Sequence, residues 1–98
     1  MLKNNIHPGE ILKYEFLDPM NLSSYKLSKE LGIQQTRISQ IIKGKRSVTA
    51  DTAIRLSKFF GTTEEFWMNL QCEYDLRNAH SEKDNEFNKI QKFEIDQA

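Results

Sequence analysis

Apolar residues return every three or four positions over much of the chain, which is the period of an amphipathic helix. Turn signals separate five such segments, at about residues 8–17, 24–31, 35–43, 50–60 and 63–79. The sequence shows neither internal repeats nor the alternation that is typical of a strand. We therefore predict an all-α fold in which five helices surround one core.

Residues that begin or stop helices lie at the expected ends of these segments. Pro8 opens the first helix, where its missing N–H would have no partner anyway, and Pro19 stops it. Gly32 can adopt the left-handed conformation that ends the second helix. Thr62, three residues before Glu65, predicts a capping box for the fifth.

After Ala79 the chain becomes polar, and Phe87, Ile90 and Phe93 stand isolated among charged and amide residues. Such a composition does not predict an ordered element by itself. A length of 98 residues suits one modest core. We therefore predict a domain over residues 1–79, including the fifth helix, followed by a short polar tail over residues 80–98.

The formal net charge is zero, but the charge is divided along the chain. Residues 1–61 hold ten basic and five acidic groups, whereas residues 62–98 hold four basic and nine acidic groups. This division suggests a basic surface for nucleic acid joined to an acidic segment that could meet a basic protein.

Several classes of protein are disfavoured by the composition. No apolar stretch approaches the roughly 20 residues of a membrane span, and the N-terminus lacks a signal-peptide core, so we expect a cytoplasmic protein without a membrane partner. Cys72 has no second cysteine, and His7 and His80 fall in no catalytic or metal-ligand spacing. We expect no enzyme activity, metal or cofactor.

The segment from Ser24 to Ile42 has the features of a helix-turn-helix. Ser28 is small where two helices would cross closely, and Gly32 permits the turn between them. Ile38 and Ile41 would hold the helix of residues 35–43 onto the core. The other face of that helix is polar, which predicts that it enters the major groove of DNA.

The candidate DNA-binding residues lie at the start of the second helix, on the polar face of the third, and in the basic loop after it. Gln can pair with adenine and Arg with guanine, whereas Lys and Arg in the loop suit phosphates. The predicted set is Ser23, Ser24, Gln34, Gln35, Thr36, Arg37, Gln40, Lys43, Lys45 and Arg46.

One domain of this size contacts few base pairs, so useful specificity requires a homodimer. The fifth helix offers more apolar surface than one side of a helix would bury in so small a core. Its candidate dimerisation residues are Trp67, Met68, Leu70, Tyr74 and Leu76. The alternative is that all of them pack within one protomer.

Four motifs carry a resemblance to a known family: residues 7–12 (HPGEIL), 44–46 (GKR), 49–53 (TADTA) and 65–71 (EFWMNLQ). In this order, and with Tyr74-Asp75-Leu76 after them, they resemble the HigA/VapI-type antitoxins, a branch of the XRE/Cro-like repressors. The resemblance covers about residues 6–79 and implies a lambda-repressor-like helix-turn-helix domain. Gln34 and Gln35 depart from the small or Ser-like residues frequent in the family.

The resemblance implies a homodimeric repressor that binds palindromic operator DNA in its own promoter. It also implies a partner, a RelE-like (HigB-type) mRNA-cleaving toxin that the antitoxin neutralises. Two alternatives remain open at this point. The chain could be a stand-alone repressor without a toxin, or a protein whose main task is neutralising another protein, with DNA binding secondary.

Overall fold

The computed structural model describes residues 5–94, so the ends of the predicted domain and tail, residues 1–4 and 95–98, lie outside it. A short helix α1 (Pro8–Ile11) continues into a π-helical segment η1 (Leu12–Leu17). The helices α2 (Ser24–Leu31), α3 (Gln35–Ile42), α4 (Ala50–Phe60) and α5 (Glu64–Phe87) follow. No strand occurs between residues 5 and 94, and the all-α prediction is confirmed.

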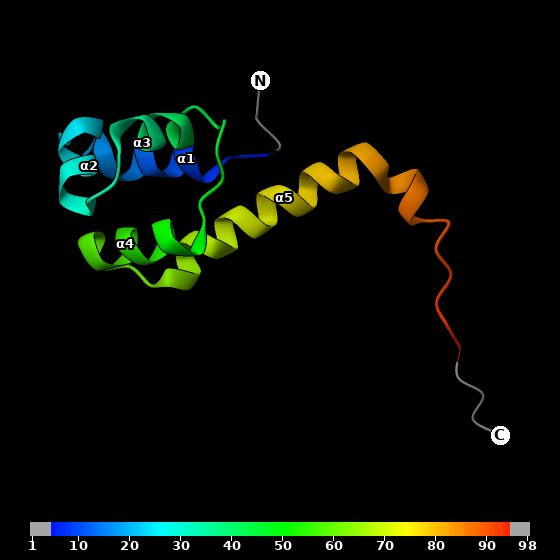
Figure 1. The fold of residues 1–98 in the computed structure, drawn as a ribbon. Coiled ribbons are helices and arrows are strands. Elements are labelled where there is room, and N and C mark those ends of the chain that lie inside the picture. Colours follow the sequence, from blue (N-terminus) through cyan, green and yellow to red (C-terminus); the bar gives the residue numbers. More distant parts are fainter. Residues whose placement is uncertain (1–4, 95–98) are drawn as a thin grey trace.

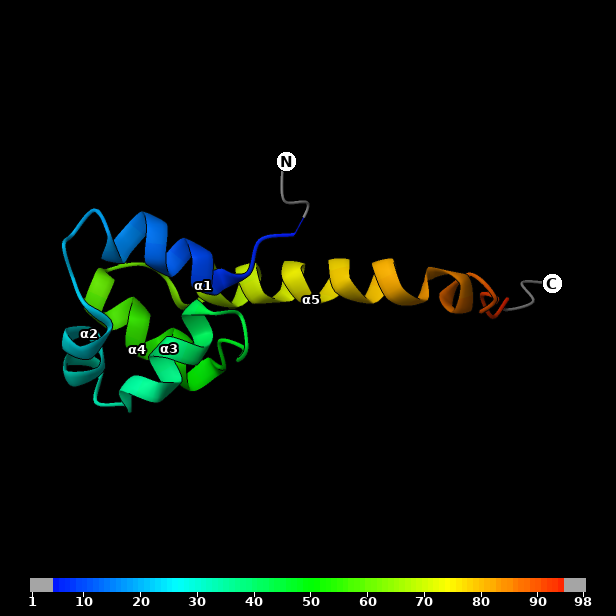
Figure 2. The ribbon, with the colours of Figure 1, turned by 90° about the horizontal axis from the view of Figure 1, so that it is seen from above.

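The segments from α1 to α4 gather into a compact head, and α5 projects away from it (Figure 1). A view from above shows the same projection (Figure 2). The chain consequently measures 61 × 35 × 21 Å along its principal axes. The first turns of α5 pack against α4 and α1, which places the base of the long helix in the core of the head.

Capping side chains fix where the helices begin. Ser23 Oγ accepts a hydrogen bond from the Lys26 backbone N–H at the start of α2. Thr49 does the same for α4, at Thr52. Gly32, with φ of 71°, ends α2 in the left-handed conformation, as the sequence predicts.

The first helix was expected to be α-helical to Leu17, but its second part is π-helical. The backbone N–H of Asp18 donates to the Lys13 carbonyl, five residues back, at 2.9 Å. Leu12 and Leu17 are also five residues apart, and both are buried. The wider turn brings both leucines to the core, which an α-helix with 3.6 residues per turn would not.

A single cluster of buried apolar side chains holds the head together. Trp67, from the base of α5, is fully buried and packs against the Phe16 ring with centroids 5.1 Å apart. Its indole N–H donates to Thr62 Oγ1 at 2.7 Å. The remaining members are Leu12, Leu17, Leu27, Leu31, Ile38, Ile41, Val48, Ala53 and Leu56.

The backbone of α1 lies directly on the end of α3 at Gly9. A Cβ atom added to Gly9 would stand 1.8 Å from the Ile41 carbonyl oxygen. Only glycine allows this approach. His7 caps the helix beside it, because its Nδ1 accepts a hydrogen bond from the Gly9 N–H at 2.9 Å and the ring is buried.

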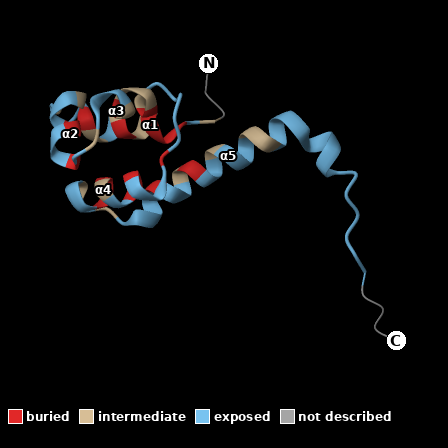
Figure 3. Ribbon diagram, in the orientation of Figure 1, coloured by how far each residue is buried: buried red, intermediate tan, exposed pale blue. Residues whose placement is uncertain are grey.

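The fifth helix differs from the prediction at both ends. It is capped by Thr63, whose hydroxyl accepts from the Phe66 N–H, because Thr62 is engaged by Trp67. It continues past Ala79 to Phe87, with non-helical backbone angles only at Lys83. Every residue from 80 to 94 is exposed (Figure 3). Between residues 5 and 94, no helix is long and apolar enough to cross a bilayer.

Candidate nucleic-acid interface

Helix α3 presents one apolar and one polar face. Ile38 and Ile41 are fully buried and fix the helix on the head. Gln34, Gln35 and Thr36, at its N-terminal end, are exposed. A helix held in this way has its polar N-terminal turn free to meet a ligand, which is the arrangement that base recognition in the major groove needs.

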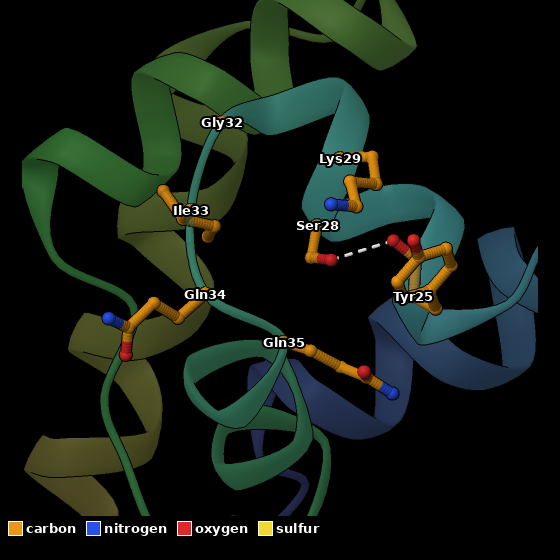
Figure 4. Close-up of a pocket in the computed structure, with 7 residues that line it drawn as sticks. All are labelled: Tyr25, Ser28, Lys29, Gly32, Ile33, Gln34 and Gln35. Carbon is orange, nitrogen blue, oxygen red and sulfur yellow. Dashed lines mark hydrogen bonds between the residues drawn. The ribbon is translucent and has the colours of Figure 1, made fainter.

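A surface pocket of about 460 Å³ lies between α2, the turn that follows it and the start of α3. Its floor includes Ser28, which is buried and donates from Oγ to the Tyr25 carbonyl oxygen at 2.6 Å (Figure 4). Gln34 and Gln35 point away from each other at its rim (Figure 4). The two amides are therefore directed to different positions of a ligand.

The basic loop follows α3 directly. Lys43, Lys45 and Arg46 are all exposed, and Gly44, with φ of 76°, turns the chain between them. The Lys45 backbone N–H donates to the Gln40 carbonyl oxygen at 2.8 Å, which fixes the loop to the end of α3. Three positive charges are thus held beside the polar face of the helix.

The remaining predicted DNA-binding residues are less free. Ser23 is exposed, but its hydroxyl serves as the cap of α2. Ser24 and Gln40 are half-buried. Arg37 is also half-buried, with 26% of its side chain exposed, and its guanidinium lies against the start of α4.

Asp51, at the start of α4, joins two arginines. Arg55 Nε donates to Asp51 Oδ1 at 2.8 Å, and Arg37 Nη2 approaches the same oxygen at 3.4 Å. The hydrogen bond from Arg55 and the positive charges of both arginines hold the pKa of Asp51 below its usual value. The Asp51 carboxylate thus links Arg37 of α3 with Arg55 of α4.

Two residues that position this surface were missed by the sequence interpretation. Gln71 is buried, and its Oε1 accepts from the Val48 N–H at 2.8 Å, so α5 anchors the chain directly after the basic loop. Arg55 Nη1 donates to the Leu31 carbonyl oxygen at the end of α2, at 2.7 Å. The spacing of four residues from Trp67 to Gln71 was the available signal, because it places both on one helical face.

The predicted dimerisation residues fall into three groups. Trp67 belongs to the core of the protomer and has no surface to offer a partner. Leu70 and Tyr74 are half-buried, and the Tyr74 ring contacts His7 edge-on with centroids 4.8 Å apart. Met68 and Leu76 are exposed.

No three His, Cys, Asp or Glu side chains of the described part of the chain lie together in a way that could hold a metal ion. Cys72 is a free thiol on the surface of α5. The exposed polar groups at the start of α3 and in the basic loop are amides, hydroxyls and cations.

Comparisons with known proteins place the chain in a family. The helix-turn-helix family model matches residues 12–67. Virulence-associated protein I of Dichelobacter nodosus is 47% identical over 78 residues, which cover 80% of this chain and 72% of that protein. Antitoxin HigA-1 of Vibrio cholerae is 41% identical over 78 residues, covering 76% of this chain and 73% of that one.

A solved structure agrees with the sequence relatives. The Pseudomonas aeruginosa antitoxin HigA, determined with the higBA promoter, matches with a TM-score of 0.88 at 37% identity. The match covers 93% of this chain and all of that one. Members of the family are regulators and antitoxins, not enzymes. The chain belongs to the helix-turn-helix family of XRE-type DNA-binding regulators, in its branch of HigA-type antitoxins.

Proposed function

We propose that this protein is the antitoxin of a type II toxin–antitoxin pair. As a homodimer it binds palindromic operator DNA upstream of its own gene and represses that operon. It also neutralises a RelE-like (HigB-type) toxin that cleaves mRNA. The observation that carries the proposal is the exposed polar turn of α3, held on a buried apolar face next to three exposed cations.

In the DNA complex, the start of α3 enters the major groove. Gln34, Gln35 and Thr36 contact base edges there, and Gln40 contacts them one turn further along. Lys43, Lys45 and Arg46 contact phosphates beside the helix, as do Ser23 and Ser24 at the start of α2. The solved relative with its promoter supports operator DNA as the ligand.

The homodimer uses the exposed side of α5. Leu76 has 55% and Met68 has 37% of its surface exposed in the protomer, and burial of both against a second copy would stabilise the pair. Leu70 and Tyr74, the other two candidates, are half-buried against the head of the protomer. Two heads joined in this way can contact two half-sites of a palindrome.

Toxin neutralisation is supported by the antitoxins among the relatives and by the acidic C-terminal third of the chain. A basic toxin would be attracted to that third, whereas DNA would be attracted to the basic head. The stand-alone repressor is the competing function. It has the same head, and only the presence of a partner distinguishes it.

A gel shift on the DNA upstream of the gene, with the neighbouring gene's protein added, tests the proposal. The wild-type protein should retard this DNA, and the added protein should form a further complex and lose its RNA-cleaving activity. No retardation would contradict operator binding. Retardation with no response to the neighbouring protein would leave a stand-alone repressor.

Two variants separate base contacts from phosphate contacts. Gln35→Ala should weaken binding chiefly at one position of each half-site, by about tenfold for a lost bidentate contact. Lys45→Ala should weaken binding to all sequences alike and reduce the salt slope by about one unit. Gln91→Ala, in an exposed segment remote from the head, is the matched control. Indistinguishable effects of the first two variants would contradict the assignment.

A further inference from the structure

Arg37 lies on the predicted recognition helix, but its contacts point to another role. We propose that Arg37 is a positioning residue that fixes α3 on the start of α4, and that it makes no bidentate contact with guanine in the operator complex. The inference rests on the proposed function, because it assigns the roles of residues within the same DNA-binding surface.

The Arg37 guanidinium is directed at α4 through one nitrogen. Nη2 donates to Thr52 Oγ1 at 2.6 Å and lies 3.2 Å from Thr49 Oγ1. Asp51 Oδ1 is 3.4 Å from the same nitrogen. Thr52 is fully buried, so the contact reaches into the head and is not a loose association at its surface.

This arrangement removes the geometry that guanine recognition requires. A guanidinium has two edges with paired N–H donors, one formed by Nε with Nη2 and the other by Nη1 with Nη2. Both edges include Nη2, whose two hydrogens are directed to α4. Arg37 can therefore give a phosphate or base a single bond from Nε or Nη1, but it lacks the fork that pairs with O6 and N7 of guanine.

Arg55 completes a latch, which we define as Arg37, Asp51, Thr52 and Arg55. Asp51 accepts from both arginines, and Arg55 also donates to the Leu31 carbonyl oxygen at the C-terminus of α2. The latch thereby ties α3 to α4, and α4 to α2. It fixes the angle between the two helices of the helix-turn-helix, on which the placement of α3 in a groove depends.

Base specificity then falls on the amides and the hydroxyl of the exposed turn, Gln34, Gln35 and Thr36, together with Gln40. Gln pairs bidentately with adenine, and the Thr methyl contacts the thymine methyl. We therefore expect the contacted positions of each half-site to include A·T pairs and no guanine that depends on Arg37.

The DNA test compares Arg37→Met, Thr52→Val and the double variant on the operator and on a series of single base-pair changes. If the latch positions α3, each single variant weakens binding to the whole series alike, by about threefold to tenfold, and the double variant is no worse than Arg37→Met. The base preferences stay those of the wild type. If Arg37→Met instead abolishes discrimination at one base pair while Thr52→Val binds normally, the proposal is wrong.

Urea unfolding of the same four proteins tests the latch without DNA. The losses in free energy of unfolding should be non-additive, with the double variant close to Arg37→Met alone. Additive losses would show that Arg37 and Thr52 act independently, and they would overturn the latch. If the wild type fails to retard its upstream DNA, the proposed function fails, and this cycle still decides whether the latch exists.

Discussion

The polar turn of α3 and the far end of α5 are both exposed, but only the first is fixed by the rest of the molecule. The inner face of α3 is anchored in the core by Ile38 and Ile41, and Arg37 ties the helix to α4. From residue 80 onward every side chain of α5 is exposed, and contacts such as the one of 2.7 Å between His80 Nδ1 and Asp84 Oδ1 lie within the helix itself. One protomer prearranges the surface proposed to bind DNA but does not cover the end of its long helix.

The difference teaches how the two surfaces are used. A prearranged surface binds without a large ordering cost, which suits recognition of a rigid duplex. The later turns of α5 carry Leu76 and Phe87 on their surface, Ile90 follows the helix, and residues 5–94 of one protomer leave all three exposed. Along α5, the change from packing against the head to full exposure falls between Gln71, which is buried, and residue 80.

Removing the anchor of α5 should have the largest effect. Trp67→Ala deletes a fully buried ring and should lower the free energy of unfolding by about 3–5 kcal/mol, since a cavity remains among Phe16, Phe60 and Phe66. Urea unfolding followed by circular dichroism measures this loss. Phe93→Ala, with 83% of the ring exposed, is the aromatic control and should change stability by less than about 0.5 kcal/mol. Similar losses for both would erase the contrast.

The next effect concerns the support of α3. Gly9→Ala places a Cβ against the Ile41 carbonyl oxygen and must push α1 from α3, which should cost about 3 kcal/mol. Gly61→Ala is the matched control, because no atom lies within 4 Å of its added Cβ and only its φ of 78° causes strain, of about 1 kcal/mol. Thermal unfolding compares the two. If Gly61→Ala is the more damaging, the contact of α1 with α3 does not support the recognition helix.

The sequence was sufficient for the elements whose boundaries carry local signals. Ser23, Gly32 and Thr49 determine helix ends through their own hydrogen bonds or backbone angles, so α2, α3 and α4 lie within a residue of their predicted bounds. The exposure of Gln34, Gln35 and Thr36 also follows from the periodicity of α3, because Ile38 and Ile41 determine which face is buried.

The sequence was insufficient where tertiary contacts decide. The π-helical turn exists because Leu12 and Leu17 both pack in the core, and residue identity alone does not indicate that turn. Arg37 on a polar face is as compatible with DNA as with Thr52, and only the position of α4 distinguishes the two. The extension of α5 to Phe87 is not predicted either, because the polar composition after Ala79 is equally typical of an irregular tail.

A smaller effect is expected where α5 holds the basic loop. Gln71→Met removes the acceptor of the buried Val48 N–H and should cost about 2 kcal/mol. The loop with Lys45 and Arg46 loses its anchor, so affinity for all DNA sequences should fall together. Unfolding and a salt titration of DNA binding measure the two effects. Gln91→Met is the exposed control, and an equal response from it would contradict the anchoring role.

The smallest effect should come from removing the far end of α5. A chain that stops after Ala79 loses only exposed residues among those described, so the free energy of unfolding at low protein concentration should change by less than about 0.5 kcal/mol. A chain that stops after Leu70 also loses the buried Gln71 and the ring of Tyr74 that contacts His7, and it should be clearly destabilised. A substantial loss of stability in the chain that stops after Ala79 would mean that residues 80–98 stabilise the head, and that the contrast between a prearranged and an uncovered surface is wrong. Sedimentation equilibrium of the chain that stops after Ala79 adds a complementary measurement. Weaker self-association at unchanged stability would show that the residues after Ala79 contribute to the contact between two copies.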